Sequence, residues 1–290
     1  MAGHMAIVAT ACLWSTSGLF IKLLPWHPVV ISGLRSFLSV IFLLAVRIIS
    51  PPPKGVKNRP FPLWAGGISY ALTMISFVIA NKLTASANAI LLQYGAPVWA
   101  ALLGWKLNRE KPLWEQWGAL LLVIGGLVFF FKDGLGSGSL AGDGIAVFSG
   151  MIFGAHSVFL RMMKDGNPRD AMLLAHVLSA IISIPFIILY PPLLSASSVI
   201  SIIYMGFLQV GLASLLFAFA LKRISAVKAM ITAVIEPILN PVWVLLVTGE
   251  KPSMAALIGG IIILAAIIGS SLISMKREER KKILIKAAND

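Results

Sequence analysis

Long apolar runs, separated by short polar linkers, dominate the chain and limit the folds open to it. We count ten runs of the length that lets an α-helix cross a bilayer, about 17 to 25 residues each. The runs are 5–24, 28–48, 61–81, 84–106, 114–131, 142–162, 169–190, 198–221, 226–248 and 254–275. Of all residues, 58% are hydrophobic and 12% are charged, whereas about a quarter of the residues in a soluble domain are charged. The sequence therefore predicts an all-α integral membrane protein with ten transmembrane helices.

The linkers and the two ends add no soluble domain. We interpret residues 1–4 as an expression remnant, and the run that follows lacks the basic start and the cleavage site of a signal peptide. The single cysteine, Cys12, lies in an apolar run, which excludes an internal disulfide and favours a role in hydrophobic packing.

Basic residues are distributed unevenly over the linkers. If the N-terminus is cytoplasmic, nineteen lysines and arginines fall on the cytoplasmic side, four fall outside, and Arg35 lies within a span. This distribution follows the positive-inside rule. We therefore expect a multi-pass protein of the cell inner (plasma) membrane with both termini in the cytoplasm. The basic tail at 276–290 is interpreted as a solvated end that sets the topology, with contact to anionic lipid as the alternative.

The two halves of the chain repeat each other. Pro97 to Glu110 matches Pro237 to Glu250 at an offset of 140, and upstream the offset is 139. The matched pairs at 139 are Ser17 and His156, Lys22 and Arg161, Gly67 and Gly206, and Tyr70 and Gln209. Because each half has an odd number of spans, the second half is inverted in the membrane. We expect a five-helix repeat at 5–131, a linker at 132–141 and an inverted five-helix repeat at 142–275, an arrangement typical of secondary transporters.

The chain also resembles the drug/metabolite transporter superfamily, and within it the EamA group. The resemblance covers nearly all of residues 5–275 and rests on Trp14-Ser15, on Arg35 and on two Pro…Glu-Lys-Pro segments. These segments are Pro97…Glu110-Lys111-Pro112 and Pro237…Glu250-Lys251-Pro252. The resemblance implies ten helices, cytoplasmic ends and a central cavity lined by helices 1, 3, 4, 6, 8 and 9. Family members move amino acids, nucleobases, drugs, quaternary amines or sugar-phosphate derivatives, so the resemblance does not name the substrate.

The strongest candidate for a binding residue is Glu236, the one carboxylate within the apolar run 226–248. A charge in hydrocarbon is costly, so this side chain must face protein or water. Thr232, Glu236 and Asn240 recur every fourth residue, which predicts one polar stripe beside a helix kinked at Pro237. Glu236 is expected to contact a cationic substrate group or to exchange a proton. The alternative is a structural pair with Arg35.

Gln93, Tyr94 and Pro97 form the mirrored segment in the first half. The proline removes a backbone donor and leaves the Gln93 carbonyl free to face a cavity. Binding of substrate and plain hydrogen bonding between helices are equally compatible with this pattern. Asn88, near the start of the same run, is a further polar candidate.

Aromatic and histidine side chains supply the remaining candidates. Trp14 and Tyr70 offer aromatic faces to a cation. Ser17 lies one helical turn from Trp14, and its mate His156 can relay protons near neutral pH. Gln209 enters through its match to Tyr70. Packing inside the bundle is the alternative role for all of them.

Arg35 lies about two turns into the second span. A guanidinium group can hold a carboxylate or a phosphate with two parallel hydrogen bonds. Since helix 2 is peripheral in the family, we favour a structural role, as an ion pair or a carbonyl cap.

Several function classes are disfavoured. The formal net charge is +13, but the basic residues lie between apolar runs, not on one face among aromatics, so we expect no nucleic-acid partner. No Walker A loop, HExxH motif or nucleophile elbow occurs, and no acidic cluster suggests a metal. We therefore expect no enzyme, no cofactor and no metal.

These patterns together predict a secondary transporter that moves a small polar or amphipathic metabolite, of the amino acid or amine class, by alternating access. It would be proton-coupled or facilitative, act as a monomer or homodimer in the lipid bilayer, and export is common in the group. An importer of a quaternary amine such as choline is the alternative within transport. A membrane sensor or scaffold without flux is the alternative outside it, and an intramembrane enzyme on lipid-linked substrates ranks below both.

Overall fold

A computed structural model describes residues 1–52, 55, 57–110, 139–233, 235–249 and 251, with scattered positions between 114 and 125 and between 254 and 277. The secondary structure of these residues is helical throughout. Seven stretches within them are long and apolar enough to cross a membrane, which confirms the predicted all-α membrane class.

In the first half the helices follow the predicted spans closely. They are α1 (Ala2–Ser15), α2 (Ser17–Leu23), α3 (Pro28–Ile49), α4 (Pro60–Leu83), α5 (Ser86–Gln93) and α6 (Ala96–Asn108). Pro28 and Pro60 each open a helix, where the missing N–H has no intrahelical partner to lose. Residues 2–4, interpreted above as an expression remnant, form the first turn of α1.

In the second half the agreement is equally close. The helices are α8 (Leu140–Met162), α9 (Pro168–Leu189), α10 (Ala196–Tyr204), the π-helix η1 (Met205–Leu212), α11 (Ala213–Leu221), α12 (Ala226–Thr232) and α13 (Ile235–Thr248). Ser139, Ser195 and Ser225 cap the starts of α8, α10 and α12.

Eight of the ten predicted spans are thus described. The predicted spans 114–131 and 254–275 and the tail 276–290 lie largely outside the described residues, as does most of the linker 132–141. Lys111, Pro112, Glu250 and Pro252, which carry part of the repeated motif, also lie outside them.

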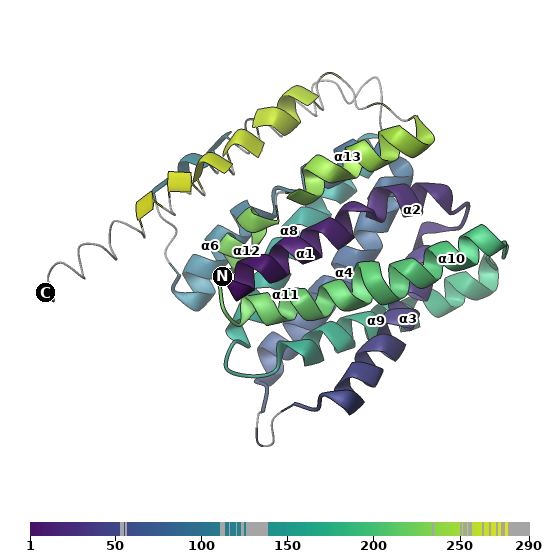
Figure 1. Ribbon diagram of the computed structural model, residues 1–290, viewed down its shortest axis with the longest axis horizontal. Helices are drawn as coiled ribbons and strands as arrows, with labels where there is room; N and C mark the ends of the chain where they lie inside the picture. Colours follow the sequence, from purple (N-terminus) through teal and green to yellow (C-terminus); the bar gives the residue numbers. More distant parts are fainter. Residues whose placement is uncertain are drawn as a thin grey trace, which may run out of the picture.

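The helix contacts occur in mirrored pairs, as an inverted repeat requires. α4 packs on α8, and α1 packs on α11; α4 packs on α9, and α3 packs on η1. Further contacts join a helix to its counterpart in the other half of the repeat: α3 packs on α9, and α5–α6 pack on α12–α13. Figure 1 shows the result as one bundle in which α1 crosses between α13 and α11. The two halves therefore enclose a common centre.

Glycines on α8 let it approach the first half closely. A Cβ at Gly150 would lie 2.5 Å from the carbonyl oxygen of Gln93, and one at Gly154 would lie 2.5 Å from that of Ala96. Such distances exclude a side chain, so these two glycines set the separation between α8 and the broken helix α5–α6.

The span that we predicted as a helix kinked at Pro237, and the mirrored span with Pro97, are each broken into two helices. The break between α5 and α6 falls at Tyr94–Gly95, and the break between α12 and α13 includes Ala233. Pro97 and Pro237 stand in the first turn of the helix that follows each break, where a proline costs little. The breaks lie at matched positions of the repeat and meet in the bundle, since the Tyr94 hydroxyl donates to the Ala233 carbonyl.

The repeat is not perfect. The first span is interrupted at Thr16, between α1 and α2, whereas its mate α8 is continuous. Conversely, α4 is regular, whereas its mate contains the π-helix η1 from Met205 to Leu212. π-helical turns inside helices often occur at functional sites. Both irregular segments supply residues to the cavity described next.

The outer faces of the bundle are apolar and exposed. On α9, for example, Ile181, Ile184 and Ile188 are more than half exposed. Such a surface fits contact with lipid. Cys12 is also exposed, so it contributes to the outer apolar surface and not to the core of the bundle.

Candidate functional site

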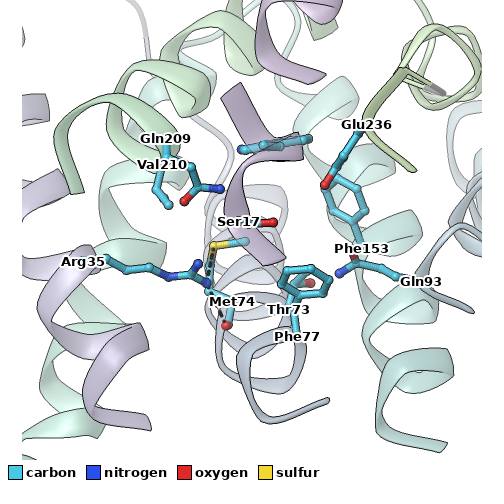
Figure 2. Close-up of a pocket in the computed structure, with 11 residues that line it drawn as sticks. Ser17, Arg35, Thr73, Met74, Phe77, Gln93, Phe153, Gln209, Val210 and Glu236 are labelled. Carbon is cyan, nitrogen blue, oxygen red and sulfur yellow. Dashed lines mark hydrogen bonds between the residues drawn. The ribbon is translucent and has the colours of Figure 1, made fainter. Parts of the chain in front are cut away.

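A small cavity lies at the centre of the bundle, between the two halves (Figure 2). Its volume is about 30 Å³, enough for about one or two water molecules. Its lining consists of Trp14, Ser17, Arg35, Thr73, Met74, Phe77, Gln93, Phe153, Gln209, Val210 and Glu236. Five of the predicted site residues are among them: Trp14, Ser17, Gln93, Gln209 and Glu236.

Glu236 stands in the first turn of α13, directly after the helix break, and is 4% exposed. The partial positive charge of a helix N-terminus favours a carboxylate there. Its Oε2 lies 3.1 Å from the hydroxyl of Tyr94, whose one hydrogen is shared between this carboxylate and the Ala233 carbonyl. Tyr94 thus lies behind Glu236 and orients it, so this predicted site residue supports the cavity without lining it.

Gln93 ends α5 at the other break and ties two helices together. Its Nε2 donates to the hydroxyl of Ser149 on α8 at 2.8 Å, and Ser149 in turn donates to the Thr73 carbonyl at 3.4 Å. The structural role that we weighed for Gln93 is therefore present alongside its place in the cavity wall.

Three polar atoms of cavity-lining residues have no hydrogen-bond partner although they are buried. These atoms are Nε1 of Trp14, Nε of Arg35 and Oε1 of Gln209. An unsatisfied buried donor or acceptor costs about 1–3 kcal/mol, so native proteins contain few of them. The residues around the cavity thus carry two donors and one acceptor that find no partner within the described chain.

Arg35 is not on the periphery of the bundle, as we had expected. Its side chain is 1% exposed and reaches the cavity from the side opposite Glu236 (Figure 2). One nitrogen donates to the carbonyl oxygen of Met74 at 3.1 Å and lies 3.6 Å from the Met74 sulfur. The carbonyl cap that we predicted is present, but the expectation of a peripheral residue is wrong because α3 turns this face toward α4.

Tyr70 and His156 belong to an aromatic cluster beside the cavity. Their rings stack at 4.5 Å, and the His156 Nδ1 lies 2.8 Å from the Gly66 carbonyl, which fixes Nδ1 as the donor. Phe153 and Phe217 complete the cluster, and each packs against Trp14. Both Tyr70 and His156 are fully buried, and neither lines the cavity. The structure places them in packing around Trp14.

Asn240 lies one turn beyond Glu236 and behind Ser17. Its Nδ2 donates to the Ser17 hydroxyl at 3.4 Å, and its Oδ1 has no partner. A Cβ at Gly18 would lie 2.4 Å from this Oδ1, so the glycine makes room for the amide. Asn240 therefore joins α13 to α2 and acts on the cavity through Ser17.

Thr232 and Asn88 are not brought to the cavity. The break at Ala233 separates Thr232 from the stripe predicted with Glu236, and Thr232 instead bonds to the Lys228 carbonyl and to His4. Asn88 faces the start of α8, where its Nδ2 lies 3.4 Å from Asp143. The fourfold spacing misled us because it assumes one continuous helix.

The sequence reasoning also missed cavity residues. Thr73, Met74 and Phe77 lie along one face of α4, and their apolar or hydroxyl side chains gave no signal. Phe153 was within reach, since it stands 139 positions after Trp14 and is thus its mate in the repeat. Among the residues that the structure describes, no group of histidine, cysteine, aspartate or glutamate side chains could hold a metal ion.

The profile of the EamA-like transporter family matches this chain twice, at residues 1–132 and 140–272. This chain belongs to the EamA-like transporter family. The match makes the protein a multi-pass membrane transporter.

Several curated relatives of this EamA-like protein carry transporter names. It is 26% identical over 266 residues to the uncharacterized transporter YwfM of Bacillus subtilis, covering 87% of this chain and 88% of that one. It is 22% identical over 280 residues to an uncharacterized transporter of Archaeoglobus fulgidus, covering 91% and 95%. Solute carrier family 35 member G1 of Mus musculus is 26% identical over 42% of this chain and 34% of its own length. These names point away from an enzyme.

A solved crystal structure has the same fold as the EamA-like protein. The TM-score is 0.71 at 20% identity, and the superposition covers 93% of this chain and 97% of the other. At this identity the likeness extends to the fold alone.

Proposed function

We propose that this EamA-like protein is a secondary transporter of a small amine-bearing metabolite, of the amino acid or amine class, that works by alternating access. The observation that carries the proposal is Glu236, a buried carboxylate in the wall of a central cavity. Aromatic faces of Trp14, Phe77 and Phe153 stand around the same cavity. A carboxylate among aromatic rings suits an ammonium group.

Alternating access is supported by matched contacts at the two ends of the bundle. At one end Arg161 bonds to Glu110 at 3.0 Å and to the Leu221 carbonyl at 3.1 Å. At the other end Lys22, the mate of Arg161, donates to the Thr84 carbonyl at 3.1 Å. Between these ends the cavity holds only about one or two water molecules, so a metabolite can enter only when the bundle opens.

We further propose that the end carrying Arg161 faces the cytoplasm of the inner membrane, with both termini there, because the basic residues concentrate at that end. We assign proton coupling to Glu236 and not to His156. Glu236 lines the cavity, whereas His156 is enclosed in the aromatic cluster.

A ligand screen of wild type and Glu236→Gln tests the proposal. Purified protein in detergent is screened by thermal shift with amines and amino acids, because a ligand that binds the folded state raises its apparent stability. Hits are then tested for counterflow in proteoliposomes. We expect hits in wild type, loss of those hits in Glu236→Gln, and their retention in Asp170→Asn. Asp170 pairs with Arg47 at a helix end and lies away from the cavity.

The outcomes separate the candidate functions. Hits that persist in Glu236→Gln contradict a contact between Glu236 and the amine. Binding without counterflow indicates a sensor or scaffold. The quaternary amine alternative predicts that choline binds and that Trp14→Leu abolishes its binding, because a trimethylammonium group depends on aromatic faces.

A further inference from the structure

Arg35 is the most deeply buried charged group that the cavity offers. It lies on α3, lines the cavity and is 1% exposed. A buried guanidinium group is costly unless an opposite charge and hydrogen bonds compensate it. The groups that compensate the charge of Arg35 therefore indicate its role.

The partners within the chain do not compensate this charge. One nitrogen bonds to the carbonyl and sulfur of Met74, and Nε has no partner. No carboxylate among the described residues lies within ion-pair distance of Arg35. Three other arginines do have one, although each is more exposed: Arg47 pairs with Asp170, Arg161 with Glu110 and Arg277 with Glu115.

The surroundings of Arg35 indicate the kind of anion that fits. Glu236 is the one acidic residue in the cavity lining, and it reaches the cavity from the opposite side (Figure 2). A carboxylate carries a single charge and matches the two parallel donors of a guanidinium group. The unpartnered Nε1 of Trp14 adds another donor in the same wall.

We propose that Arg35 binds the carboxylate of the transported molecule while Glu236 faces its amine. The inference rests on the proposed function and narrows the substrate to zwitterionic amino acids, as opposed to simple or quaternary amines. Trp14, Phe77 and Phe153 would then surround the side chain, which favours apolar or aromatic amino acids. The cavity as described is too small for such a molecule, so binding accompanies opening of the bundle at one end.

The test compares three amino acids with the amines that remain when the carboxylate is removed. The pairs are leucine and isoamylamine, methionine and 3-methylthiopropylamine, and phenylalanine and phenethylamine. Affinities are measured by concentration-dependent thermal shift of the full chain in detergent. We expect wild type to bind at least one amino acid about tenfold or more tightly than its amine, the gain given by a charge-assisted hydrogen bond in a buried site.

The variant Arg35→Gln should bring that ratio close to one while the amine still binds. Arg47→Gln is the matched control, since it makes the same change on the same helix at a surface ion pair, and it should keep the wild-type ratio. If Arg35→Gln does not fold, Arg35→Lys retains the charge but offers no fork of two parallel donors. It should weaken the preference for the amino acid.

Each result decides the inference. Equal binding of amino acid and amine by wild type overturns it, as does an unchanged ratio in folded Arg35→Gln, or in Arg35→Lys where only that variant folds. Loss of amine binding in Glu236→Gln would in those cases leave the proposed function standing. If Glu236→Gln binds every probe normally while the Arg35 variants lose the preference, the carboxylate site stands and the amine contact fails. If no probe binds wild type, both proposals fail.

Discussion

At the scale of single residues, the site depends on side chains that hold other side chains. Tyr94 illustrates this, because its hydroxyl reaches both the Ala233 carbonyl and the Glu236 carboxylate. One hydroxyl thus joins the two helix breaks and orients the acidic group. Ser149 and Asn240 do the same for Gln93 and Ser17.

Replacing Tyr94 with phenylalanine should lower the free energy of unfolding by about 0.6 to 2 kcal/mol, because the hydroxyl is the group that links the two breaks. Unfolding by a denaturing detergent measures this change. Tyr190→Phe is the control, because Tyr190 is half exposed and contributes through stacking on His27. A Tyr94→Phe variant as stable as Tyr190→Phe would contradict the role given to the hydroxyl.

At the scale of helices, α8 owes its place to glycine. Gly154 allows the backbone of α6 to lie against α8, and a Cβ there would meet backbone atoms of Ala96 and Ala100, which cannot turn aside. Two turns or more away, Gly144 on the same helix faces open space. Substitutions at Gly154 and at Gly144 therefore separate the effect of helix packing from the effect of helix propensity.

Gly154→Ala should therefore destabilise the protein by about 1–3 kcal/mol, the usual range for overpacking. Gly144→Ala should leave stability unchanged or raise it by about 0.5–1 kcal/mol, because alanine favours the helix. Both are measured by thermal unfolding in detergent. Equal stability of the two variants would contradict the close contact between α8 and α6 at Gly154.

The sequence predicted helix positions better than helix faces. Apolar length and prolines at helix starts located the described spans to within a few residues, since both act locally. The repeat also led from Tyr70 to Gln209, a true cavity residue. Arg35 was misplaced because the face that a helix turns inward depends on the helices around it. Thr232 was misplaced because the break at Ala233 ends the regular spacing of residues along the helix. Local patterns contain neither kind of information.

At the scale of the whole molecule, the loops before and after α9 lie at opposite ends of the bundle. Lys164 precedes this helix and Ala196 follows it, and both are exposed. In a Cys12→Ala background, Lys164→Cys should react with a membrane-impermeant maleimide only in inverted vesicles, and Ala196→Cys only in intact cells. The reverse labelling would overturn the orientation, and labelling of both from one side would overturn the topology.

The irregular turns at Met205–Leu212 have no counterpart in α4. Two perfectly mirrored halves would give inward-facing and outward-facing forms of equal free energy, so an empty carrier would divide its time evenly between the two sides. With unlike halves that equality is lost, and a difference of about 1.4 kcal/mol already favours one form tenfold. For the alternating access proposed above, we therefore expect the empty transporter to populate mainly one of its two forms, so that solute on one side of the membrane binds first.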